Sequence, residues 1–180
     1  MKIVQAGSLL FFVLAAVFAV GGMVVPSLWQ VNRSTIIAKN PEAIYPHLAS
    51  LKAWEQWSVW TKAQDPTLVY TYEGPESGVG AKQHWTSEKM GAGWLEITEA
   101  SPESGIVYTL FIDMGHFQST IMGKIQLERT GISTKVTWSD HGDAGDNLVK
   151  KWMNMIIDPM LGKQLETSLA HLKALIEKSA

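Results

Sequence analysis

The sequence contains no cysteine, which excludes disulfide bonds, thiolate metal sites and cysteine nucleophiles. Charged residues are scarce, at 18% of the chain, and lysine and arginine form no run or stripe. We therefore expect no nucleic-acid partner, because such surfaces need clustered positive charge. Motifs with metal-ligand spacing, a serine nucleophile or a phosphate-binding loop are also missing, so the sequence predicts no metal and no cofactor.

The chain is instead rich in tryptophan, with eight in 180 residues, and it begins with a long apolar run. No residue from Ile3 to Val25 is charged. As a helix this run measures about 34 Å, which exceeds the bilayer hydrocarbon core of about 30 Å. Residues 1–27 are therefore predicted to form a transmembrane anchor that contacts the membrane through residues 3–25.

Two alternatives to an anchor stay open for this segment. One is a cleaved signal peptide, with Val17-Phe18-Ala19 as a small-residue cleavage site. The other is a buried helix of a soluble protein. For the anchor and for the cleaved signal peptide alike, Lys2 favours the inner side of the membrane. The remaining domain is then expected on the periplasmic or extracytoplasmic side.

Residues 28–180 have the length of one ordinary domain. Alternating apolar and polar residues predict strands, and turn residues separate them at short intervals, which favours an antiparallel meander. The predicted strands cover residues 31–38, 68–73, 80–88, 94–100, 106–114, 117–129 and 132–140. Met90-Gly91-Ala92-Gly93 is predicted as a turn between two of them.

Helices are predicted on both sides of these strands. Two short ones follow the first strand, over residues 41–50 and 51–57, with Asn40 and Pro41 as the helix start. Two more end the chain: the first begins after Asp146 or Asn147, and Asp158-Pro159 begins the second. Trp54, Trp57 and Trp60 recur at intervals of three, which predicts a shared face that packs in the core, lines a pocket or contacts the bilayer.

This order of elements resembles the START/SRPBCC superfamily, which includes polyketide cyclase-like and lipid-binding proteins, and in particular its membrane-tethered bacterial branch. The resemblance covers roughly Val31 to Lys178. The stretches that carry it are residues 31–36 (VNRSTI), 40–45 (NPEAIY), 54–60 (WEQWSVW), 65–66 (DP), 78–81 (GVGA), 134–138 (TKVTW) and 161–173. It is specific for the fold and weak for any activity, because one scaffold hosts carriers, cyclases and chaperone activators.

The resemblance implies an α+β helix-grip fold, in which a curved antiparallel sheet wraps around a long C-terminal helix and leaves an elongated cavity. The ligand it implies is a hydrophobic small molecule or lipid. Candidate lining residues are the bulky apolar side chains Trp57, Trp60, Trp85, Trp94, Tyr108, Leu110, Phe117, Ile121, Trp138, Met155 and Leu165. Alternation assigns faces only within one strand, so the sequence does not decide which face points inward.

Two other functions remain as alternatives. A polyketide cyclase or dehydratase would need at least two titratable side chains inside one pocket. An envelope protein-interaction module would need a filled core and an exposed apolar patch. Of the polar residues, His84 is predicted to face away from Trp85, and Arg33 is predicted to pair with an acid rather than to take part in catalysis.

Overall fold

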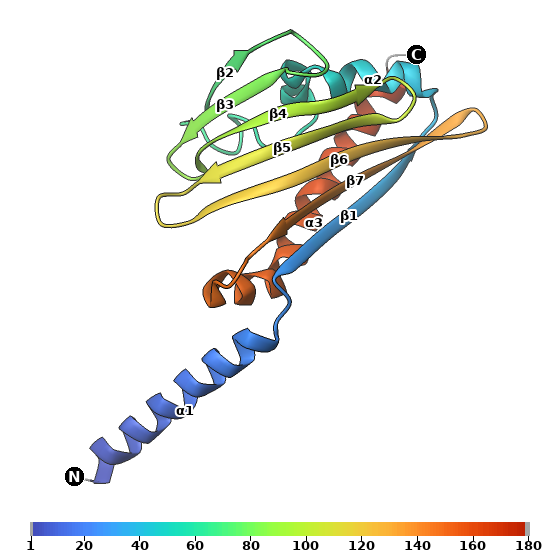
Figure 1. Ribbon diagram of the computed structural model, residues 1–180. Helices are drawn as coiled ribbons and strands as arrows, with labels where there is room; N and C mark the ends of the chain where they lie inside the picture. Colours follow the sequence, from blue (N-terminus) through green and yellow to red (C-terminus); the bar gives the residue numbers. More distant parts are fainter. Residues whose placement is uncertain (1, 179–180) are drawn as a thin grey trace.

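The predicted N-terminal helix is present as α1, Lys2–Val24, and it projects away from the rest of the molecule (Figure 1). The computed structural model describes residues 2–178, and the side chains of residues 12–178. Within these limits no helix combines the length and apolar character of a membrane span. The side chains of residues 1–11, in the first half of the predicted anchor, lie outside the described part.

The domain is built on one antiparallel sheet of seven strands. Its strands, in chain order, are β1 Leu28–Ile37, β2 Val69–Glu73, β3 Lys82–Ser87, β4 Gly91–Ser101, β5 Gly105–Asp113, β6 Gln118–Thr130 and β7 Ser133–Asp143. Their order in the sheet is β1-β7-β6-β5-β4-β3-β2, so β2 to β7 form a continuous meander and β1 pairs with the last strand. The predicted meander is confirmed.

The turn predicted at residues 90–93 is misplaced: the chain turns at residues 88–90, and β4 begins at Gly91. Both glycines are needed inside this strand. A side chain at Gly91 would collide with the backbone of Asp113, and Gly91 has a positive φ of 67°. A side chain at Gly93 would collide with the ring of Trp85. Gly91 closes the hairpin opposite Ser87 with its positive φ, whereas Gly93 is explained by the close approach of Trp85.

The helices are α2 Pro41–Ala49, the short 3₁₀ helix η1 Leu51–Gln56, and α3 Leu148–Lys178. The prediction of two C-terminal helices is wrong, because α3 continues through Pro159. Asn147 does begin it, since its Oδ1 accepts a hydrogen bond from the Lys150 N–H at 3.0 Å. Pro159 removes one backbone donor from the interior of α3, a cost that the packing of the helix outweighs.

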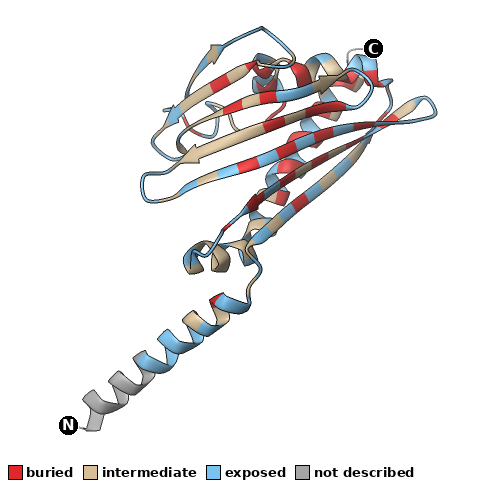
Figure 2. Ribbon diagram, viewed as in Figure 1, coloured by how far each residue is buried: buried red, intermediate tan, exposed pale blue. Residues whose placement is uncertain are grey.

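The second half of α3 packs along the sheet and supplies much of the core. Four of its apolar side chains are buried, and we call them the inward stripe: Leu165, Leu169, Leu172 and Ile176. The buried residues of β6 and β7 alternate with exposed or partly exposed ones along each strand, so one face of the sheet is buried (Figure 2). The architecture is the expected α+β helix-grip fold, a seven-stranded antiparallel sheet packed on a long C-terminal helix.

Candidate ligand-binding site

Four aromatic side chains fill the middle of the space between the sheet and α3. We call them the aromatic cluster: Trp54, Trp57, Tyr108 and Trp138. Trp54 lies at the centre, with ring centroids 5.0 Å from Trp57, 5.7 Å from Tyr108 and 5.5 Å from Trp138. Its contacts with Tyr108 and Trp138 are edge-to-face, an arrangement that aromatic rings favour. The elongated cavity implied by the resemblance is thus occupied at its centre by side chains.

A chain of hydrogen bonds runs through this cluster. Trp138 Nε1 donates to the hydroxyl oxygen of Tyr108 at 2.7 Å, and the Tyr108 hydroxyl donates to Asp140 Oδ1 at 2.5 Å. Tyr108 lies over Gly123, where a side chain would overlap its ring. All three polar groups are buried, so these bonds compensate for water that they have lost.

Burial alters the proton affinity of this group of residues. Desolvation raises the pKa of Asp140 to about 6, against an opposing effect of its hydrogen bonds to Tyr108 and Trp138. Desolvation, together with the nearby Asp140 charge, raises the pKa of Tyr108 well above its ordinary value. Asp140 therefore titrates near pH 6, whereas Tyr108 keeps its proton in that range.

Apolar side chains that remain partly exposed surround the buried core. We call six of them the inner rim: Trp29, Trp60, Trp85, Leu110, Ile157 and Leu161. They come from β1, the loop after η1, β3, β5 and α3, and all pack against the core. Trp60 joins the rim directly to the cluster, with its ring centroid 6.0 Å from that of Trp138. The rim leaves apolar surface available beside a rigid aromatic wall.

The first turn of α3 is tied to the β5–β6 hairpin. Lys150 Nζ donates to the Gln118 carbonyl at 2.6 Å and lies 5.2 Å from the ring centroid of Phe117. This contact holds the beginning of α3 next to the end of the sheet. It places Phe117 at this end of the domain.

The structure brings most of the suggested lining residues together, in two layers. Trp57, Tyr108, Ile121, Trp138 and Leu165 are buried in the core, and Trp60, Trp85 and Leu110 lie in the inner rim. Three others do not join them, and one of these is Phe117, which lies at the β5–β6 hairpin next to Lys150. Trp94 faces the opposite side of the sheet, where its ring stacks on that of Phe111. Lys82 Nζ lies over the Trp94 ring, 4.3 Å from its centroid. Met155 is exposed on α3.

Sequence reasoning did not single out Asp140 as a candidate. The available signal was its position two residues after Trp138 in a strand, which places both side chains on one face. His84 lies as predicted on the face opposite Trp85, beside Trp94, with its Nε2 3.3 Å from Glu73.

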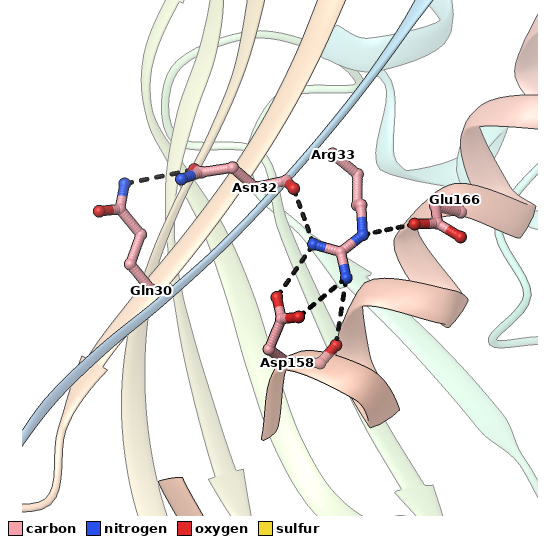
Figure 3. A network of polar contacts seen from close by, with 5 residues as sticks. All are labelled: Gln30, Asn32, Arg33, Asp158 and Glu166. Carbon is pink, nitrogen blue, oxygen red and sulfur yellow. Dashed lines mark hydrogen bonds and ion pairs between the residues drawn. The ribbon is translucent and has the colours of Figure 1, made fainter. Parts of the chain in front are cut away.

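Arg33 fixes β1 to α3 through an ionic network at the edge of the sheet (Figure 3). Its Nη1 lies 2.9 Å from Asp158 Oδ1 and its Nε lies 2.5 Å from Glu166 Oε1. Asp158 and Glu166 are eight residues apart on one helix face, and Gly162 between them leaves room for the guanidinium. The hydrogen bond from Arg33 lowers the pKa of Asp158, and the predicted pairing of Arg33 with an acid is confirmed.

A surface groove of about 300 Å³ lies beside this network, between β1 and the second half of α3. Its lining residues are Ser34, Thr35, Glu166, Leu169, Ala170, Lys173, Ala174 and Glu177. Except for Leu169 these side chains are small or polar, and none was suggested by the sequence. The groove is separate from the inner rim.

Comparison with known proteins agrees with this architecture. The model of the family described as polyketide cyclase/dehydrase and lipid transport matches residues 29–177. No curated protein is significantly similar in sequence.

Similar solved structures include protein CV1439 from Chromobacterium violaceum, at 18% identity and a TM-score of 0.55, covering 82% of this chain and 96% of that one. Ara h 8.0201 is 11% identical with a TM-score of 0.59, and the match covers 84% of this chain and 99% of that protein. Protein MLL2253 from Mesorhizobium loti is 15% identical with a TM-score of 0.59, with coverages of 84% and 98%. At these identities the likeness shows the fold alone.

Proposed function

Because the chain belongs to the polyketide cyclase/dehydrase and lipid transport family, with an SRPBCC domain, we propose that it binds an apolar small molecule or lipid at the inner rim. The observation that carries the proposal is the position of partly exposed Trp60, Trp85 and Leu110 against a closed aromatic core. Apolar surface beside a preformed wall gains free energy when a ligand displaces water from it. The filled centre limits the ligand to the rim.

Native mass spectrometry of the full chain in detergent tests this proposal by detecting a co-purified apolar molecule. Binding is then measured with cis-parinaric acid, a fluorescent fatty acid. We expect Leu110→Glu to weaken this binding by about tenfold or more, since it places a charge in the apolar contact. Met122→Glu is the matched control, because Met122 lies on the neighbouring strand, alternates with buried Ile121 and is exposed. Equal binding by both variants would contradict an inner-rim site.

We also propose that α1 anchors the domain to a membrane, with the domain on the extracytoplasmic side. The uncharged run from Ile3 to Val25 and its continuous helix support this proposal. A single cysteine introduced by Lys178→Cys is unique in the chain. In intact bacterial cells expressing the protein, a membrane-impermeant maleimide should label it, and alkaline carbonate should leave the chain in the membrane fraction. Release by carbonate would refute the anchor, and absence of labelling would refute the orientation.

A second candidate function is acid–base catalysis by Asp140 and Tyr108, of the cyclase or dehydratase kind. It is favoured by two hydrogen-bonded titratable groups in one apolar interior, one with a pKa of about 6. It ranks second because both side chains are buried, so a substrate reaches them only when the aromatic cluster opens. Turnover of a β-ketoacyl analogue that is lost in Asp140→Asn would favour catalysis. Binding of the analogue without turnover would contradict catalysis and favour the role of a carrier.

A further inference from the structure

The first half of α3 exposes a row of apolar side chains. We call it the outward stripe: Val149, Met153, Ile156 and Met160, each between 39% and 63% exposed. The intervals of four, three and four residues place them on one helix face. An exposed and uninterrupted apolar face of this kind marks an interaction surface rather than an ordinary solvent-facing helix.

This stripe does not face the proposed ligand site. In a regular helix it is rotated by about 160° from the inward stripe, which begins sixteen residues later. The side of the same half that faces the domain is already occupied. Ile157 and Leu161 pack against the core, and Lys150 binds the Gln118 carbonyl. A ligand at the inner rim would therefore not cover the outward stripe, and a different partner must contact it.

The stripe lies next to α1. Trp152 joins the two helices: its ring stacks on Phe18 at 5.9 Å, and its Nε1 donates to the Phe18 carbonyl at 3.0 Å. Gly21 and Gly22 allow this close approach, since a side chain at either would collide with or crowd Trp152. Asn154 adds hydrogen bonds to the Pro26 and Ser27 carbonyls. The first half of α3 thus lies at the end of the domain from which α1 leaves (Figure 1).

The apolar surface continues from this stripe onto α1. The exposed apolar residues of that helix and its exit include Val13, Leu14, Val17, Val20, Met23, Val24 and Leu28. Trp152, whose ring and N–H are both used in its contact with Phe18, joins the two surfaces. Because this surface continues onto α1, the partner that fits it is the lipid bilayer in which we propose that α1 is anchored.

We propose that the outward stripe rests in the headgroup–acyl boundary of a lipid bilayer and so fixes the orientation of the domain on the membrane. The proposal rests on the anchoring role of α1 proposed above. In this arrangement α3 is an interfacial helix in its first half and a core helix in its second. The β5–β6 hairpin, tied to the first turn of α3 by Lys150, is then held close to the lipid surface.

Single cysteines carrying an environment-sensitive NBD fluorophore test this proposal on the full chain, because the sequence has no native cysteine. The labelled chain is reconstituted in vesicles of phosphatidylcholine and phosphatidylglycerol. For Met153→Cys and Ile156→Cys we expect a blue-shifted emission and roughly twofold quenching by lipids that carry a doxyl group near the headgroup.

Two further positions serve as controls. His171→Cys lies on the same helix face and is exposed, but it is fifteen residues beyond Ile156 and about 22 Å farther along the helix, so it should show neither change. Val13→Cys reports on the anchor itself and is tested with lipids that carry the doxyl group deep in the acyl chain, because Val13 lies near the middle of residues 3–25. Quenching at Val13 without quenching at Met153 or Ile156 would overturn the stripe proposal while leaving the anchor intact.

The remaining outcomes are also decisive. Quenching at Met153 and Ile156 but not at Val13 would support the interfacial contact and refute the anchor. Quenching at none of these positions would overturn both proposals. Cross-linking of Ile156→Cys chains to each other, with no lipid quenching, would assign the stripe to a second copy of the chain and overturn the bilayer contact.

Discussion

The two halves of α3 carry the same spacing of apolar residues in opposite surroundings. In the second half, Leu165 is fully buried and its stripe packs on the sheet. In the first half, Ile156 is 53% exposed, although its stripe has the same intervals of four, three and four residues. Helical periodicity therefore predicts a face, and the opposing structure decides whether that face becomes core or remains a surface.

The difference arises from what lies opposite each half. The second half faces the concave sheet, whose buried residues alternate along β6 and β7. The first half passes beyond this support, where its neighbours are the β5–β6 hairpin and the end of α1. Arg33 holds the boundary, since it binds Asp158 from the first half and Glu166 from the second.

The largest expected effect separates the two stripes by stability. Leu165→Ala should lower the free energy of unfolding by about 2–5 kcal/mol, because it leaves a cavity in a packed interior. Ile156→Ala, the matched control, should change it by less than about 0.5 kcal/mol, as is usual for exposed positions. Urea unfolding of the full chain in detergent micelles measures both. Equal losses would show that the outward stripe is part of the folded core.

The next effect concerns the charge buried under the second half of α3. The pKa of Asp140 is about 6 in the folded protein and takes an ordinary value of 3.8 when unfolded. Between these values the folded state binds more protons than the unfolded state, so stability is full below about pH 4 and falls as pH rises through 6. Asp140→Asn should remove this dependence, a relative change of roughly 2 kcal/mol between pH 4 and 7.5.

Unfolding curves at several pH values, in the same micelles, measure this change. Asp140→Asn keeps an acceptor for the Tyr108 hydroxyl, so the hydrogen bond itself is retained. His47→Gln is the control for other titrations in this range: burial lowers the pKa of His47, so its titration makes stability rise with pH, opposite to the effect of Asp140. If stability still falls with rising pH in Asp140→Asn, the buried carboxylate is not the source of the fall.

A smaller effect is expected at the boundary between the halves. Arg33→Met removes both ion pairs and the hydrogen bond to the Asn32 carbonyl, and should lower the melting temperature by a few degrees. Arg129→Met is the control, because Arg129 pairs with Glu42 on the exposed surface, where ion pairs contribute little. If both variants melt alike, Arg33 does not stabilise the packing of α3 on β1.

The comparison also explains which features the sequence predicts. Strands β2 to β7 follow from alternation and turn residues. The pairing of Arg33 was predicted only as its commoner role, and its partners Asp158 and Glu166 lie 125 and 133 residues away in the sequence. The break assigned to Asp158-Pro159 was wrong because local proline chemistry was outweighed by the packing of α3 on the sheet. Local propensity does not include that long-range term.

The candidate site was less predictable for a related reason. Trp85 and Trp94 occur in neighbouring strands, yet the register places them on opposite faces of the sheet. The hydrogen bond between Tyr108 and Asp140 joins residues thirty-two apart in the sequence, so no local motif reveals it. Filling of the centre by the aromatic cluster depends on side-chain packing between η1, β5 and β7, which periodicity does not specify.

The smallest expected effect tests how closely α3 approaches β1. Gly162→Ala alone should leave stability almost unchanged, because the helix-propensity gain of about 1 kcal/mol is offset by collision of the new methyl group with the Arg33 guanidinium. In the Arg33→Met background the collision is reduced and the gain of about 1 kcal/mol should reappear. The double-mutant cycle, measured by urea unfolding, isolates this coupling. Additive effects would mean that Gly162 serves no role in seating Arg33 between the two halves of α3.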